Sequence, residues 1–211
     1  MTKTIGLIGG MSWESSIEYY RIINQQTRKI LGGTHSAKSV MISVDFAEIE
    51  LLQHQGRWDE ATAVLVATAK NLELAGADFV VLCTNTMHKM ANAIQENIHI
   101  PFLHIADATA EVIKAAGIST IGLLGTRFTM EEDFYKARLN TKYGLEVLVP
   151  EKPDREFIHQ VIYDELVKGI ISTESKKGFL AIIDKLIANG AEGIILGCTE
   201  IGLLIKDRDC E

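Results

Sequence analysis

The sequence predicts an α/β fold made of two pseudo-symmetric, doubly wound parallel-sheet domains, with the active site in the cleft between them. Short apolar runs alternate along the chain with helical patterns, an order typical of parallel strands covered by helices on both faces. Two motifs also occur twice: residues 4–10 match residues 120–126, and residues 76–86 match residues 190–200. Because the two spacings, 116 and 114 residues, are nearly equal, each half is expected to carry the same pair of strands.

The individual elements follow from local patterns of apolar residues. Short apolar runs predict strands at about 4–9, 39–45, 78–84, 120–125, 145–149 and 192–198, with a further short strand before His104. Longer segments with helical periodicity predict helices at about 14–30, 58–75, 87–97, 106–116, 130–143, 154–168 and 173–189. Four of these helices are expected to end at a glycine that precedes the next strand: Gly76, Gly117, Gly144 and Gly190.

A proline marks the boundary between the two halves. Pro101 ends a helical segment and begins a connection, because its ring removes a backbone N–H and restricts Ile100. We therefore expect a first α/β half at residues 1–100 and a second at residues 101–199, with the C-terminal segment 200–211 joining the first half.

The composition bounds the class of protein. The chain has 211 residues, of which 47% are hydrophobic and 23% charged, so it can form a true core. Its net charge of −7 argues against a nucleic-acid or membrane-binding surface, since both favour clustered Lys and Arg. Neither a signal peptide nor a membrane span is expected. The odd number of cysteines, three, indicates a reducing cytoplasm without a disulfide framework.

The polar strand ends are the first candidate site, because ligands of parallel α/β sheets collect at the C-terminal edges of strands. Residues 82–88 and 196–200 are both strand-to-loop-to-helix transitions, whose backbone N–H groups could hold a carboxylate. The same positive helix end is expected to lower the pKa of Cys198 and favour its thiolate. A small cysteine packed at a strand end is the alternative reading.

Cys83 and Thr84 compete for the equivalent role in the first half. Adjacent strand residues point to opposite faces, so one of the two is expected to face the cleft. The internal repeat places Cys198 opposite Thr84 and Gly197 opposite Cys83. Cys83 is therefore expected to pack behind the sheet, although a bend at the strand end would remove the basis for this alternation.

The loop at residues 9–15 resembles a phosphate cradle but lacks the glycine spacing of a dinucleotide site. A tight turn in which Met11 and Ser12 line the cleft is favoured instead. Thr126 begins the matching loop of the second half, where Arg127 could meet an acidic group or lie on the surface. His88 could orient a ligand or make a local hydrogen bond.

The remaining histidines and cysteines give no metal signal. His104 is expected to be structural, and the six histidines show no metal-ligand spacing. Cys210 lies in a polar tail, so neither a metal nor another cofactor is predicted.

The chain resembles the aspartate/glutamate racemase family, most closely the L-aspartate/glutamate-specific branch of enteric bacteria. The resemblance runs along almost the entire chain and rests on residues 5–11 (Ile-Gly-Leu-Ile-Gly-Gly-Met), Asn85-Thr86, and residues 197–200 (Gly-Cys-Thr-Glu). It implies a cofactor-independent racemase of two α/β domains, commonly a homodimer, acting on a small acidic amino acid. Catalytic roles would then fall to Cys198 and to Thr84 or, as the less favoured choice, Cys83. Substrate-binding roles would fall to Met11, Ser12, Gln53, Asn85, Thr86, Thr126, Thr199 and Glu200.

The sequence departs from the family pattern in three ways. Thr84 stands where most relatives have a cysteine before Asn-Thr, as in an atypical Thr/Cys branch. The arginine that holds the substrate's side-chain carboxylate has no clear counterpart, since residues 45–50 are acidic; Gln53, Lys168 or Arg127 could substitute. Relatives usually continue for another strand and helix beyond the point where this chain stops.

Other functions are compatible with the same motifs. Relatives of this fold include hydantoin racemases, decarboxylases of malonates and maleate isomerases, which use similarly placed cysteines. A catalytically weak module that binds acidic amino acids is the alternative outside enzymes. Proton exchange at the α-carbon would distinguish a racemase from this binding module.

Overall fold

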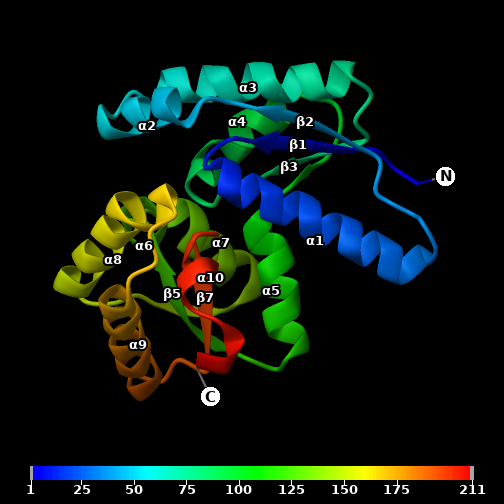
Figure 1. The fold of residues 1–211 in the computed structure, drawn as a ribbon. Helices are drawn as coiled ribbons and strands as arrows, with labels where there is room; N and C mark the ends of the chain where they lie inside the picture. Colours follow the sequence, from blue (N-terminus) through cyan, green and yellow to red (C-terminus); the bar gives the residue numbers. More distant parts are fainter. Residues whose placement is uncertain (1, 210–211) are drawn as a thin grey trace. The chain divides into compact units, whose positions relative to one another are not determined.

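The computed structural model describes residues 2–209 and divides into two compact units, Met1–His104 and Ile105–Glu211. Each unit contains one parallel sheet with helices packed against it (Figure 1). The predicted α/β class with two parallel sheets is therefore confirmed. Within residues 2–209, no helix combines the length and apolar character needed to cross a bilayer.

The first unit is built on a four-stranded sheet in the order β2-β1-β3-β4, with every neighbouring pair parallel. Its strands are β1 (Ile5–Gly9), β2 (Ser39–Ser43), β3 (Phe79–Leu82) and β4 (Phe102–Leu103). Its helices are α1 (Trp13–Leu31), α2 (Phe46–His54), α3 (Trp58–Leu74), the 3₁₀ helix η1 (Thr86–Met90) and α4 (Ala91–Glu96).

A main apolar core of the first unit lies between its sheet and α3. Leu65 and Leu72 of α3 are fully buried against Ile8 and Val80 of the central strands. Gly6 allows this close packing, because an added Cβ would lie 2.9 Å from the Cβ of Ala77 and 3.3 Å from that of Leu72. Figure 1 shows α1 on the other side of β1 from α3, so helices cover both faces.

The second unit is built on a three-stranded parallel sheet in the order β6-β5-β7. Its strands are β5 (Thr120–Gly125), β6 (Glu146–Leu148) and β7 (Gly193–Gly197). Its helices are α5 (Ile105–Ala115), α6 (Arg127–Glu131), α7 (Asp133–Tyr143), α8 (Lys152–Asp164), η2 (Leu166–Lys168), α9 (Thr173–Ala188), α10 (Ile201–Leu204) and η3 (Asp207–Asp209).

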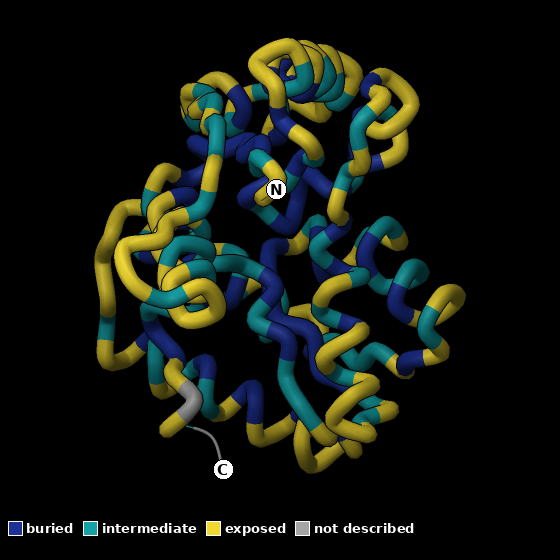
Figure 2. Tube along the Cα trace, turned by 90° about the vertical axis from the view of Figure 1, so that its right-hand side faces the viewer, coloured by how far each residue is buried: buried dark blue, intermediate teal, exposed yellow. Residues whose placement is uncertain are grey.

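Alternate residues of β5 supply two separate cores in the second unit. Ile121 and Leu123 pack with residues of α5 and α7, whereas Leu124 packs with residues of α8 and α9. This alternation explains why β5 is an almost uninterrupted apolar run, since both faces of the strand are buried. Buried residues accordingly concentrate in the interior of each unit, and exposed residues lie along the outer turns of the helices (Figure 2).

The internal repeat is reproduced in the strand register. Ile5 pairs with Phe79 in the first unit, and Ile121 pairs with Gly193 in the second. Ile121 lies 116 residues after Ile5, and Gly193 lies 114 residues after Phe79, so both differences equal the repeat spacings. The next three pairs along the strands show the same two differences. The order β2-β1-β3 likewise corresponds to β6-β5-β7. The two matching motifs therefore form equivalent strand pairs, as the sequence predicts.

Several predicted helices differ in extent from the observed ones. The predicted helix at 130–143 is two helices, α6 and α7, because Glu132 between them has an extended backbone. The predictions at 87–97 and 154–168 each cover an α-helix joined to a 3₁₀ segment. Helix α2 was not predicted; it begins after Asp45, whose side chain caps it by accepting a hydrogen bond from the Ala47 N–H at 3.0 Å.

The C-terminal segment belongs to the second unit, whereas the sequence analysis expects residues 200–211 to join the first half. Ile201, Leu204 and Ile205 are buried in the core that α8 and α9 form. The unit boundary follows His104, a few residues beyond the expected Ile100-Pro101 boundary. Residues 210 and 211 lie outside the described part of the chain.

Candidate functional site

In the first unit, Cys83 and Thr84 follow directly after β3 and differ in burial. Cys83 is fully buried: its backbone N–H donates to the Ile8 carbonyl at 2.9 Å, and its carbonyl accepts from the Ser15 hydroxyl at 2.9 Å. Burial raises the pKa of the Cys83 thiol to about 12. Thr84 is partly exposed. As expected from the alternation of side chains along the strand, Cys83 packs inside the fold and Thr84 does not.

His88 holds the backbone of Thr84 in place. The Nδ1 atom of His88 lies 2.7 Å from the Thr84 carbonyl oxygen. Because a carbonyl can only accept, this nitrogen carries the proton and donates it. The imidazole is buried and lies against His104, with 4.6 Å between ring centroids. Of the two roles considered for His88, the local hydrogen bond is the one that the structure shows.

The opening loop after β1 is anchored by three serines. Ser12 caps α1 by accepting from the Ser15 N–H at 3.5 Å. The Ser16 hydroxyl donates to the Ser12 carbonyl at 3.0 Å and accepts from the Gly10 N–H at 2.8 Å. Met11 and Ser12 are both buried. Ser15 and Ser16 thus hold the loop in place, a role that was not predicted from the sequence. Their position in the first helical turn after the glycines could have indicated it.

Gln53 connects the unpredicted helix α2 to this strand end. Its side chain is buried, and Nε2 lies 2.9 Å from the sulfur of Met87 in η1. Asn85 and Thr86, which precede Met87, are also buried. The structure thus places Gln53 against Met87, the residue that follows Asn85-Thr86, which sequence separation alone did not indicate.

In the second unit, Cys198 follows β7 and lies against a carboxylate. The Cys198 thiol donates a hydrogen bond to Oε2 of Glu200 at 2.9 Å. Cys198 is partly exposed as a whole residue, while Glu200 is only 4% exposed. The thiol therefore lies at the end of β7 next to a buried acidic group.

The prediction of a lowered pKa for Cys198 is wrong. Burial of the sulfur is the largest cause that raises its pKa well above the ordinary value, followed by the charge of Glu200 and its hydrogen bond. The backbone N–H groups of Thr199 and Glu200 act in the predicted direction but are outweighed. The surroundings of Cys198 consequently favour the neutral thiol over the thiolate.

The two strand ends agree in burial at three of four positions; the exception is Asn85, which is buried, whereas its counterpart Thr199 is partly exposed. Cys83 and its counterpart Gly197 are buried, whereas Thr84 and its counterpart Cys198 are partly exposed. Thr86 and its counterpart Glu200 are buried again. Together with the strand register, this pattern makes Thr84 the structural equivalent of Cys198.

The opening loop of the second unit is formed by Thr126, the N-cap of α6. Its hydroxyl accepts from the Thr129 N–H at 3.3 Å, and both residues are buried. Arg127 is exposed, and its guanidinium lies 5.6 Å from the ring centre of Phe128. Lys168 is also exposed and lies 3.7 Å from Asp164. Of the three proposed substitutes for the missing arginine, only Gln53 is buried.

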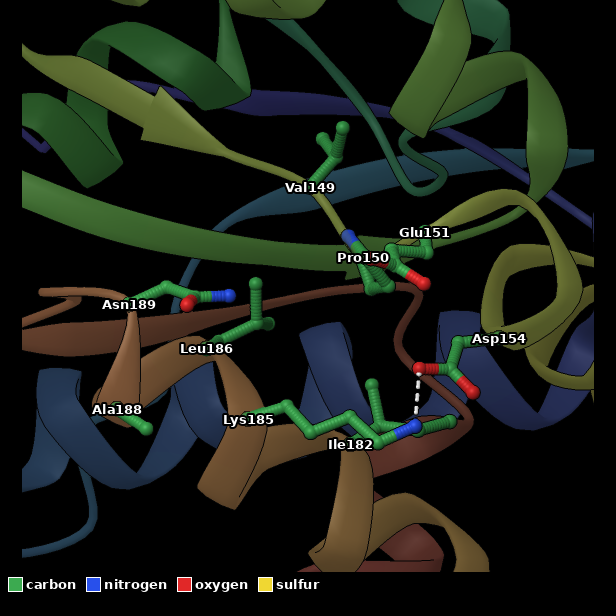
Figure 3. A pocket seen from close by; sticks show the side chains of 9 residues that line it. All are labelled: Val149, Pro150, Glu151, Asp154, Ile182, Lys185, Leu186, Ala188 and Asn189. Atoms are coloured by element: carbon green, nitrogen blue, oxygen red, sulfur yellow. Dashed lines mark hydrogen bonds and ion pairs between the residues drawn. The ribbon is translucent and has the colours of Figure 1, made fainter.

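Residues 2–209 contain no cluster of three His, Cys, Asp or Glu side chains suited to a metal ion. Cys210 lies outside these residues. A cavity of about 340 Å³ in the second unit is formed where β6 ends, beside α8 and α9 (Figure 3). Its lining contains none of the predicted site residues, and two of its side chains, Lys185 and Asp154, form an ion pair at 2.7 Å.

Solved structures with the same fold cover almost the entire chain. A candidate Asp/Glu racemase from Yersinia pestis is 54% identical, with a TM-score of 0.92 over 100% of this chain and 91% of that one. An aspartate racemase homologue from Pyrococcus horikoshii is 34% identical, with a TM-score of 0.83 over 99% of this chain and 90% of that one.

Sequence comparison agrees with the structural matches. The broad-specificity amino-acid racemase of Bacillus subtilis is 22% identical over 98% of this chain and 89% of its own length. The family model described as Asp/Glu/Hydantoin racemase matches residues 8–211. These relatives support an amino-acid racemase. The strand-end motifs and the match over nearly the whole chain show that this protein belongs to the Asp/Glu/Hydantoin racemase family.

Proposed function

We propose that this protein is a PLP-independent racemase that interconverts L- and D-aspartate, L- and D-glutamate, or both, by two-base transfer of the α-proton. The observation that carries the proposal is the equivalence of Thr84 and Cys198 at the ends of β3 and β7. Racemisation needs a base on one face of the α-carbon and a proton donor on the other. A duplicated strand end with one polar hydrogen-bearing group in each half is suited to that requirement.

In this proposal Cys198 removes or returns the α-proton on one face, and Thr84 acts on the other. Cys83 is the less suitable partner, because it is fully buried and its pKa is raised to about 12. A hydroxyl is a weaker acid than a thiol, so the two proton transfers are chemically unequal. The reaction should therefore start more easily from Cys198.

The α-proton of an amino acid is only weakly acidic, so the carbanion must be stabilised electrostatically. Hydrogen-bond donors arranged before the reaction are the most effective way to stabilise such charge. The residues proposed to supply them, through side chain or backbone, are Met11, Ser12, Asn85, Thr86, Thr126 and Thr199. Supporting this role, Ser12 and Thr126 are both buried caps of the first helix after a central strand.

Recognition of an acidic substrate is supported by the comparisons with racemases of aspartate and glutamate. Gln53 is the favoured residue for the substrate's side-chain carboxylate, because it is buried and contacts Met87, whereas Arg127 and Lys168 are exposed. An amide can donate to a carboxylate without adding charge. The proposal includes a homodimer, as the family resemblance implies, and a cytoplasmic location, which the odd number of cysteines favours.

Proton NMR in deuterated buffer tests the function directly. L-Asp, D-Asp, L-Glu and D-Glu are each incubated with the protein, and the α-proton signal is followed with chiral analysis of the products. We expect loss of that signal together with appearance of the mirror enantiomer, without added cofactor. Absence of exchange from all four substrates would refute the proposal, and ligand-induced stabilisation without exchange would instead indicate a binding module.

A further inference from the structure

A second cavity, of about 280 Å³, lies in the first unit at the edge of the sheet opposite to the candidate site. Ile5 and Phe79, the first residues of β1 and β3, line it, whereas Thr84 follows the other end of β3. The last turns of α1 complete the wall, and in Figure 1 the start of β1 and the C-terminal end of α1 lie on the same side of this unit. The cavity is therefore separate from the strand-end residues on which the proposed function rests.

Hydrogen bonds hold the walls of this cavity in place. The Ala37 N–H donates to Oδ1 of Asn24 at 3.0 Å, which ties the segment before β2 to α1. The Ile5 N–H donates to the Lys38 carbonyl at 2.9 Å, which joins the same segment to β1. A site whose walls are already fixed loses little conformational entropy when a ligand binds.

Apolar side chains form most of the wall. Ile5 and Phe79 are half-buried, and Ile30 and Leu31 at the end of α1 are 78% and 45% exposed. Single exposed apolar residues are normal on a protein surface, but here several of them surround one hollow. Because burying apolar surface is favourable, this wall suits the apolar body of a ligand.

Two lysines give the same cavity a positive rim. Lys3 and Lys38 both line it and are exposed, and the lining residues that the structure describes include no Asp or Glu. Neither lysine forms an ion pair with another residue of the range 2–209. Asp78 precedes Phe79, but its carboxylate accepts from the Thr4 N–H at 2.6 Å and is not part of the lining. In a chain with a net charge of −7, this local positive charge complements an anionic group.

We propose that this cavity binds a small amphiphile whose apolar body packs against Ile30, Leu31 and Phe79 and whose carboxylate lies near Lys3 and Lys38. The ligand class is a free aliphatic carboxylate. A lipid surface is disfavoured, because the net negative charge of the chain repels anionic head groups. This binding site goes beyond the proposed racemase function and does not depend on it.

Calorimetric titration with butanoate, hexanoate and octanoate tests both parts of the ligand. Each methylene group that enters the cavity should lower the Kd about fourfold, and the gain should stop once the cavity is filled. Octan-1-ol, which has the same chain without the charge, should bind more weakly than octanoate. A Kd that does not change with chain length, or equal binding of the alcohol, would overturn the proposal.

Proton–nitrogen correlation NMR locates the bound octanoate. We expect the largest shifts at the backbone amides of the cavity wall, namely Ile5, Thr27 and Ala37. Shifts confined to Thr84 and Asn85 would instead show that the carboxylate occupies the candidate site, and the proposed cavity would then be refuted.

Three substitutions at exposed positions test the wall and the rim without disturbing the core. Ile30→Gln should raise the Kd for octanoate by about threefold or more. Lys3→Gln and Lys38→Gln should each raise it about twofold to fivefold, with a smaller effect at high salt. Leu74→Gln and Lys114→Gln are the matched controls, because both residues are exposed and neither lines the cavity. Equal losses of affinity in the control variants would contradict the assignment.

Two other occupants give different results. If a second copy of the chain covers this cavity, octanoate will fail to bind the dimer, and sedimentation velocity will show that Ile30→Gln dissociates it. Affinity for vesicles of anionic lipid without affinity for free octanoate would indicate a lipid surface. Either result would overturn the proposal. All of these measurements are made without an amino-acid substrate, so failure of this proposal and failure of the racemase proposal are separate outcomes.

Discussion

Glu192 accepts a hydrogen bond through Oε2 from the backbone N–H of Thr120, the first residue of β5, at 2.9 Å. The same oxygen accepts from the Ser119 N–H at 2.7 Å. Its counterpart in the first unit is Asp78, whose Oδ2 accepts from the Thr4 N–H at 2.6 Å. In both halves, an acidic residue before the second strand of the repeat thus fixes the start of the central strand.

The contribution of Glu192 to stability should depend on pH. Its hydrogen bonds to Ser119 and Thr120 lower its pKa in the folded state. A lowered folded-state pKa gives stability that is present above the ordinary carboxyl pKa of about 4.3 and is lost as pH falls through the folded value. Glu192→Gln should therefore lower the denaturation midpoint at neutral pH and differ little from wild type in acid. A difference in midpoint between variant and wild type that stays constant across this pH range would contradict the prediction. Glu156→Gln is the control, because it removes one carboxylate charge from an exposed position near Lys152.

Cys198→Ala should reduce α-proton exchange by at least about 10²-fold in both directions, because the variant lacks the group that carries the proton on one face. The measurement is proton NMR in deuterated buffer, starting from each enantiomer separately. Retention of substantial exchange in a folded variant would remove Cys198 from the mechanism.

Cys83→Ala should keep most of the activity. The Cys83 sulfur is fully buried, so its removal should cost stability on the order of 1 kcal/mol while the proposed catalytic groups remain. Chemical denaturation gives the stability, and initial rates give the activity. Thr84→Val is the paired variant and should lose activity while staying folded. The reverse pattern would move the catalytic role from Thr84 to Cys83.

The two enantiomers of a substrate should show unequal maximal rates. A threonine hydroxyl is a poor resting base, so proton abstraction by the Cys198 side should be faster than abstraction by the Thr84 side. The equilibrium constant must stay near one, since the two products are mirror images. Progress curves from pure L- and pure D-substrate measure both quantities. Equal maximal rates would argue against the Thr/Cys assignment.

Gly6→Ala should destabilise the protein by about 1–3 kcal/mol, the usual cost of overpacking a core. The new methyl group would lie 2.9 Å from the Cβ of Ala77 and 3.2 Å from the Phe79 carbonyl, neither of which can rotate away. Gly202→Ala is the control, because an added Cβ there has no neighbour within 4 Å among the described residues. Chemical denaturation of both variants measures the difference.

The internal repeat was enough to predict two similar halves. The repeated motifs are about 115 residues apart, and similar local sequences with similar apolar patterns form equivalent strand pairs, as the register of β1–β3 and β5–β7 shows. Alternation along β3 also indicated that Cys83 and Thr84 would differ in burial, because neighbouring strand residues point to opposite faces.

The direction of the Cys198 pKa shift and the place of the C-terminal segment, by contrast, depend on packing in three dimensions. The backbone N–H groups of Thr199 and Glu200 lower the pKa of Cys198, but burial and the Glu200 carboxylate raise it by more. Burial depends on packing against α8 and α9, which also draws Ile201 and Leu204 into the second unit. A local sequence pattern encodes neither the burial of Cys198 nor the packing of Ile201 and Leu204, because both depend on contacts between segments that are distant along the chain.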